Sequence, residues 1–279
     1  MSKVEGLLLW PALFGYTITF ITYLIFTVFS KERLESRAWG LFIVSFLFQT
    51  ASIAWRWYVS GRIPVMVSYE HYQLGAWFVA LCTVLGGMYY RKMRIFAIGS
   101  AVVILFMLGV GMNTYSAMDP LRPPYRSNWI FIHIGFAWFA WGCFVLAAVL
   151  AVVYLFKTPG REGGRIMKKF PSREIMDELM MKMILFGFIC QGFTIAAGAI
   201  WAHQLWGRYW GWDPVETWSL VCLLVYGLVL HFRLMMGWKG AKMAVLVILS
   251  LSTSIIYFWG IGFIPESHTS MMLLEMGND

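Results

Sequence analysis

The chain has 279 residues, of which 60% are hydrophobic and only 13% are charged. A soluble globular domain carries about twice that charged fraction, so the composition excludes an ordinary soluble domain. The apolar residues come in long runs, as membrane-spanning helices require because backbone groups in hydrocarbon must be paired within the helix itself. We therefore expect an all-α integral membrane protein, built as a single polytopic domain over residues 1–279.

Eight apolar segments approach the ~20 residues that a bilayer crossing needs. In chain order the predicted spans are 7–30, 38–59, 72–90, 95–112, 128–156, 183–203, 214–236 and 243–264. The first span is too long for a signal-peptide core and lacks a small-residue cleavage site, so we expect it to be retained. In the longest inner loop, 157–182, Ser172 is a candidate N-cap for a helix that runs into the sixth span.

The Lys and Arg residues predict the orientation of these spans. If the turn after the first span is cytoplasmic, the inner segments hold 16 of the 22 basic residues and the outer segments hold six. This bias follows the positive-inside rule and predicts both termini on the outer side. The net charge of +8 is then a sign of topology, and we expect the lipid bilayer, with no nucleic acid, as its partner.

The four cysteines all fall inside predicted spans and form no C-x-x-C pair, so we expect packing residues without thiol–disulfide chemistry. More informative are three segments that the predicted topology places on the same outer face. These are a Pro-rich loop at 113–127, an aromatic loop at 204–213 and the tail from residue 265. A site assembled there would draw on several spans.

The strongest local signal is the segment 206–218, WGRYWGWDPVETW, with four Trp in thirteen residues. An interfacial aromatic belt is one interpretation. Packed aromatic rings with interleaved glycines favour another, a platform for a large planar ligand that stacks and buries its apolar surface. The candidate ligand-binding residues here are Trp206, Gly207, Tyr209, Trp210 and Trp212.

The end of this segment has a simpler role. Asp213 as N-cap, Pro214 at the first helical position and Glu216 two residues later form the pattern that opens a helix. We therefore expect Asp213 to support the site by fixing where the aromatic loop ends and the seventh span begins.

The histidines separate into three groups. His133, near the outer end of the fifth span, and His268, in the outer tail, both reach the aromatic loop in the predicted topology, and two such histidines suit axial ligation of a haem iron. His231 lies 18 residues after Asp213, or about 27 Å deeper on the same helix, near the inner side. His71 and His203 sit at outer span ends, where we expect interfacial anchoring.

These motifs resemble a known family. Residues 198–202, the aromatic segment 206–218 and Leu230–Leu234 are similar to the Trp-rich WWD signature of the CcsA/ResC family, the cytochrome c assembly proteins of system II. The VSYEHYQLGAW segment at 67–77 and a C-terminal Pro-x-x-His element extend the resemblance over most of the chain. Val215 stands where the family often has Lys, and His203 where it usually has Asn or a similar residue.

The resemblance implies a function in cytochrome c biogenesis, with haem b as substrate. It implies that His133 and His268 hold haem iron at an external site, and that His231 serves an inner haem site whose second ligand comes from a CcsB/ResB-type membrane partner. The chain would then be a haem-presenting subunit of a holocytochrome c synthase (haem lyase) complex, inactive alone. It would transport haem for attachment to the Cys-x-x-Cys-His motif of apocytochrome c. The expected location is the bacterial cytoplasmic (inner) membrane, or the thylakoid membrane if the protein is plastid-encoded.

Three alternatives remain open at this point. A system I-type WWD protein would deliver haem to a chaperone instead of joining it to cytochrome. A b-type haem subunit that reacts with quinone belongs to a different class, but it would place paired histidines deep in facing helices. A transporter of an organic ion would need a buried charged pair or a broken helix at the midplane.

Overall fold

The computed structural model describes residues 1–157 and 166–260. This part of the chain contains eight helices long and apolar enough to cross a membrane, which confirms the predicted all-α class and number of spans. The helices are α1 (Lys3–Phe29), α2 (Arg33–Ser60), α3 (Ser68–Tyr89), α4 (Ala97–Met112), α5 (Asn128–Phe156), α6 (Arg173–Trp206), α7 (Pro214–Leu234) and α8 (Ala241–Ile255). A 3-10 turn, Arg91–Phe96, precedes α4, and a π-helical turn, Ile256–Gly260, extends α8.

Side-chain caps explain where several helices begin. Ser2 and Glu5 form a capping box at the start of α1, and the Ser172 hydroxyl accepts the N–H of Ile175 at the start of α6. The predicted Ser172 cap is therefore confirmed, but α6 begins ten residues before the predicted span. The fifth span has the predicted bounds, and the last four residues of the predicted eighth span lie outside the described residues.

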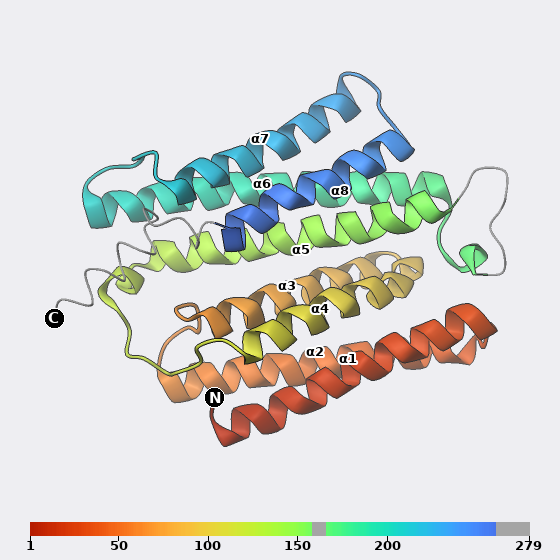
Figure 1. Ribbon diagram of the computed structural model, residues 1–279, viewed down its shortest axis with the longest axis horizontal. Helices are drawn as coiled ribbons and strands as arrows, with labels where there is room; N and C mark the ends of the chain where they lie inside the picture. The colour runs from red at the N-terminus through yellow and green to blue at the C-terminus, as the bar shows by residue number, and fades with distance from the viewer. Residues whose placement is uncertain (158–165, 261–279) are drawn as a thin grey trace.

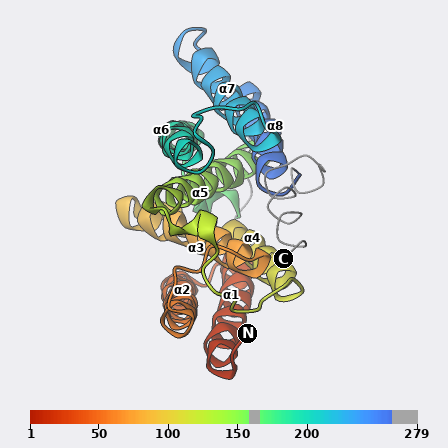
Figure 2. The same cartoon turned by 90° about the vertical axis from the view of Figure 1, so that its left-hand side faces the viewer.

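Helix α5 is the centre of the bundle. Figure 2 shows it between α6, α7 and α8 on one side and α3 and α4 on the other, with α1 and α2 beyond them. Two-thirds of its most apolar stretch is buried, more than in any other span of the described chain. Residues on α5 therefore contact both halves of the protein.

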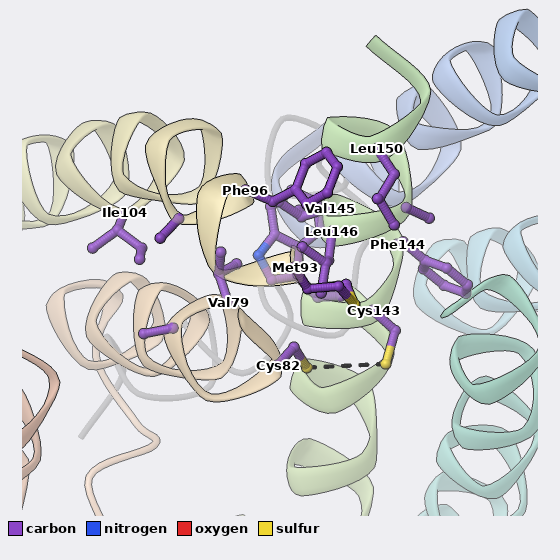
Figure 3. Packing of buried hydrophobic residues seen from close by; sticks show 14 of the residues in the cluster. Val79, Cys82, Met93, Phe96, Ile104, Cys143, Phe144, Val145, Leu146 and Leu150 are labelled. Carbon is purple, nitrogen blue, oxygen red and sulfur yellow. Dashed lines mark hydrogen bonds between the residues drawn. The ribbon is translucent and has the colours of Figure 1, made fainter. Parts of the chain in front are cut away.

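The core around α5 is hydrophobic and close-packed. Figure 3 shows Val79 of α3, Phe96 from the turn before α4 and Val145 of α5 within one cluster of buried residues. Cys82 and Cys143 meet in this cluster with their sulfur atoms 3.9 Å apart, and both are free thiols. Their burial confirms the packing role predicted for them.

One end of the bundle, on the left in Figure 1, contains the N-terminus and three connections. These are the α2–α3 turn, the α4–α5 connection and the α6–α7 connection. We refer to this end as the outer end, following the prediction from the charge distribution. The loop 113–127 and the aromatic loop therefore lie at the same end of the bundle, as predicted. The tail from residue 265 lies outside the described residues.

A buried ion-pair cluster fixes the first half of this end. The Arg56 guanidinium donates to Glu70 at 2.7 Å and to Glu5 at 3.3 Å, and Arg62 donates to both oxygens of Glu70 at 3.0 Å. The two arginines also donate to three carbonyl oxygens of the segment 116–119. Charge-assisted bonds of this kind are strong and directional. They tie α1, α2 and α3 to the loop that leads into α5.

Candidate functional site

His133 is the best-defined candidate ligand. It lies in the second turn of α5, and its Nδ1 is 2.8 Å from the carbonyl oxygen of Thr194 on α6. Because a carbonyl only accepts, Nδ1 carries the proton and Nε2 presents a lone pair. A histidine whose second nitrogen donates to a backbone carbonyl is held in the orientation and tautomer that metal ligation requires. The ring also stacks on Trp201, with centroids 6.4 Å apart.

Two cavities meet at this histidine. The smaller, about 50 Å³, lies on the side of the aromatic loop and is lined in part by Trp206, Tyr209 and Trp210. The larger, about 410 Å³, lies between α3, α5 and the end of α8, and His133 lines both. Sites for small organic ligands typically have volumes of about 300–1,000 Å³. Only the larger of the two is in that range.

The floor of the larger cavity is aromatic. Tyr72 and Trp259 stack with centroids 5.8 Å apart, and Trp138 stacks on Phe258 at 4.4 Å. Flat aromatic faces of this kind suit a planar apolar ligand. A third cavity, apolar and of about 590 Å³, lies between α4, α5 and α8, and Tyr72 and Trp259 line it as well.

The aromatic loop is shaped by backbone conformation and by helix caps. Gly207 ends α6 with a left-handed φ of 69°, and Trp212 adopts a positive φ of 58°, which is uncommon for a non-glycine residue. Asp213 accepts the N–H groups of Val215 and Glu216, which confirms the predicted N-cap of α7. The Glu216 carboxylate accepts the N–H of Gly211 at 2.6 Å and so closes the loop onto the helix.

The predicted residues of this loop therefore divide into two sets. Trp206, Tyr209 and Trp210 line the smaller cavity, whereas Gly207 and Asp213 shape the backbone and Trp212 is 70% exposed. The indole N–H of Trp210 is buried and has no hydrogen-bond acceptor among the described residues. A buried donor without an acceptor is costly, so a polar group of a ligand is a suitable partner for it.

Hydrogen bonds hold the aromatic loop against the other outer segment. The Trp201 indole donates to the carbonyl of Pro124 at 2.9 Å, and the Ser127 hydroxyl donates to Gln204 at 2.6 Å. Ser127 also caps α5. The end of α6 and the start of α5 are thus joined directly above His133.

The remaining histidines lie in different surroundings. His231 is in the last turn of α7, at the opposite end from the aromatic loop, and is exposed. His203 is exposed and stacks on Tyr209 at 4.2 Å. His71, which we interpreted as an interfacial anchor, instead lines the larger cavity together with His133. His268 lies outside the described residues.

Sequence reasoning missed two features of the site. One is the Thr194 carbonyl, because a backbone acceptor leaves no trace in residue type. The other is the inward position of His71, which depends on how α3 packs against α5. The residue types around His71 give no local signal of that position.

Comparison with known proteins agrees with the sequence motifs. The profile of the family described as "Cytochrome C assembly protein" matches residues 65–268. The chain is 27% identical over 254 residues to "Cytochrome c biogenesis protein CcsA" of Synechococcus sp. (strain RCC307), covering 80% of this chain and 81% of the relative. It is also 27% identical over 274 residues to the protein of the same name from Guillardia theta, covering 89% and 90%.

A solved structure shares the fold. "Cytochrome c Heme Lyase CcmF" superposes with a TM-score of 0.70 at 17% identity, covering 98% of this chain and 51% of that protein. The chain therefore spans about half the length of that structure, and the likeness shows the fold alone. The resemblance to CcsA proteins inferred from the Trp-rich segment is confirmed, and the match over residues 65–268 shows that the chain belongs to the cytochrome c assembly protein family.

Proposed function

We propose that this chain binds haem b at its outer end and presents it for thioether attachment to the Cys-x-x-Cys-His motif of apocytochrome c. Membership of the family assigns it to cytochrome c biogenesis. The observation that carries the finer proposal is the geometry of His133. Its Nδ1 is bound to a carbonyl, so Nε2 is free as a ligand beside a cavity of about 410 Å³ and the aromatic loop.

The residues fit the chemistry of haem. A neutral imidazole is the commonest axial ligand of haem iron, and the aromatic floor and the rings of the loop suit an apolar macrocycle. Trp210 and Arg208 are candidates to bind the propionates, the first through its buried indole N–H and the second through a guanidinium that lies against Gly211. His268 is proposed as the second axial ligand, as its position in the family motif implies.

A membrane partner of the CcsB/ResB type is proposed to bind along α7. Leu224, Leu228 and His231 are spaced by three or four residues, so they lie on one face of the helix, and all three are exposed. A histidine on an exposed apolar stripe is costly in lipid. A partner helix that also supplies a ligand would give His231 its role at the proposed inner haem site and would make the chain one subunit of the synthase.

The proposed location is the bacterial cytoplasmic membrane, or the thylakoid membrane if the protein is plastid-encoded. Eight spans make the chain a multi-pass protein in either case.

The proposal is tested by cytochrome c maturation in cells that depend on this protein and its partner. His133→Ala is expected to abolish covalent haem attachment while the protein still accumulates in the membrane. His203→Ala is the matched control, because that histidine is exposed and lines neither cavity at His133. Normal maturation with His133→Ala, or equal loss with both variants, would contradict the proposed role of this site.

A further inference from the structure

His71 lies on the same cavity as His133 but on a different helix. It is the fourth residue of α3, whereas His133 is on α5, and the two helices pack side by side. The His71 ring is 6.2 Å from the ring of Trp138. Trp138 follows His133 by five residues, or about 7.5 Å along the helix axis. Both imidazoles line the same cavity of about 410 Å³, one from α3 and one from α5.

The backbone that carries His71 is held rigidly. The adjacent Glu70 accepts the N–H groups of Met66 and Val67 as well as the two buried guanidinium groups, and so fixes the first turn of α3. Glu70 faces α1 and α2, whereas His71 faces the cavity beside α5. This rigid support is what a ligand-binding side chain needs to be held in place before its ligand arrives.

The ring nitrogens of His71 are available to a ligand. Neither one has a hydrogen-bond partner among the described residues. The cavity that the ring lines is about eight times larger than the one beside the aromatic loop. Of the two cavities at His133, the one that His71 lines therefore offers more space for a ligand.

We propose that His71 is an additional ligand of the haem iron, binding the face opposite His133 when His268 does not. This inference rests on the proposed function, because it takes His133 as the first ligand.

The test uses the full-length protein in detergent, loaded with haem b, and measures the spin state of the iron by absorption and electron paramagnetic resonance. The His268→Ala variant is expected to keep low-spin, six-coordinate haem. Adding His71→Ala to it is expected to convert the haem to the high-spin, five-coordinate form, and added imidazole is expected to restore the low-spin spectrum. Adding His203→Ala instead is the matched control and is expected to change nothing.

Two results would overturn the inference. One is a high-spin spectrum in His268→Ala alone, and the other is a low-spin spectrum that persists in the His71→Ala/His268→Ala double variant. If that double variant holds no haem, His71→Met in the His268→Ala background is measured instead. A thioether in place of an imidazole ligand raises the reduction potential of the haem. A potential equal to that of His268→Ala would therefore exclude His71 as a ligand. Failure of the proposed function itself looks different, because His133→Ala would then leave haem binding unchanged.

Discussion

Replacing Gly198 with alanine is expected to weaken haem binding at His133 by about 10- to 100-fold, the usual effect of disturbing the group that orients a metal-binding histidine. A Cβ at residue 198 would lie 2.7 Å from His133 Nδ1, whereas ordinary contacts begin at 3.4 Å. The ring must therefore move away from α6 by about 0.7 Å. The acceptor of its hydrogen bond, the Thr194 carbonyl, is one turn earlier on the same helix, so the 2.8 Å bond lengthens toward the limit for hydrogen bonding.

The matched control is Gly192→Ala, on the same helix. No atom lies within 4 Å of the Cβ position at residue 192, and both substitutions raise helix propensity by about 0.8–1.0 kcal/mol. The assay is a haem titration of the full-length protein in detergent. The tenfold to hundredfold loss corresponds to about 1.4–2.7 kcal/mol of binding free energy. Equal haem affinities for the two alanine variants would refute the argument that the Nδ1–carbonyl bond holds the ligand.

Three further predictions concern the contacts around the site. Glu70→Gln removes the negative charge shared by two buried arginines, and is expected to destabilise the protein in detergent by about 3–5 kcal/mol. Glu178→Gln, in an exposed ion pair, is the control and is expected to leave the unfolding midpoint unchanged. Asp177→Asn weakens the carboxylate contacts to Arg233 and to the α7–α8 turn, so amide hydrogen exchange in that turn is expected to accelerate. An unchanged exchange rate would show that other contacts hold the turn. Trp210→Phe keeps an aromatic ring but removes the buried N–H, and is expected to lower haem affinity severalfold. Trp212→Phe makes the same change at an exposed ring and is expected to leave the affinity unchanged. Equal affinities for the two variants would exclude the Trp210 N–H as a haem contact.

Much of the fold was predictable because the apolar runs are long enough to be counted. The largest error, at the start of α6, has a clear cause. Residues 173–182 contain several charged side chains, so they do not resemble a membrane span, yet the helix continues through them. Asp177 is nearly buried and pairs with Arg233 of α7, and Ser172 supplies the cap. Pairing between helices is not visible in a hydropathy pattern.

The candidate site was predictable in part for a similar reason. The aromatic segment and its Asp213 cap are local features, and the structure confirms the cap. The contributions of Thr194 and His71 depend on packing between α5 and its neighbours, which no local pattern reports. The buried cluster around Arg56 also joins three helices. In the sequence, each of its members therefore looks like an isolated charge at the end of a span.

The central claim, that His133 holds haem, is tested most directly by an absorption spectrum of the full-length protein purified with its membrane partner, compared with the same preparation of His133→Ala. The account predicts low-spin haem with two histidine ligands in the unaltered protein, and its loss or conversion to high-spin haem in the variant, with added imidazole restoring the spectrum. A variant that keeps the same haem content and the same spectrum, or an unaltered protein that binds no haem, would contradict it.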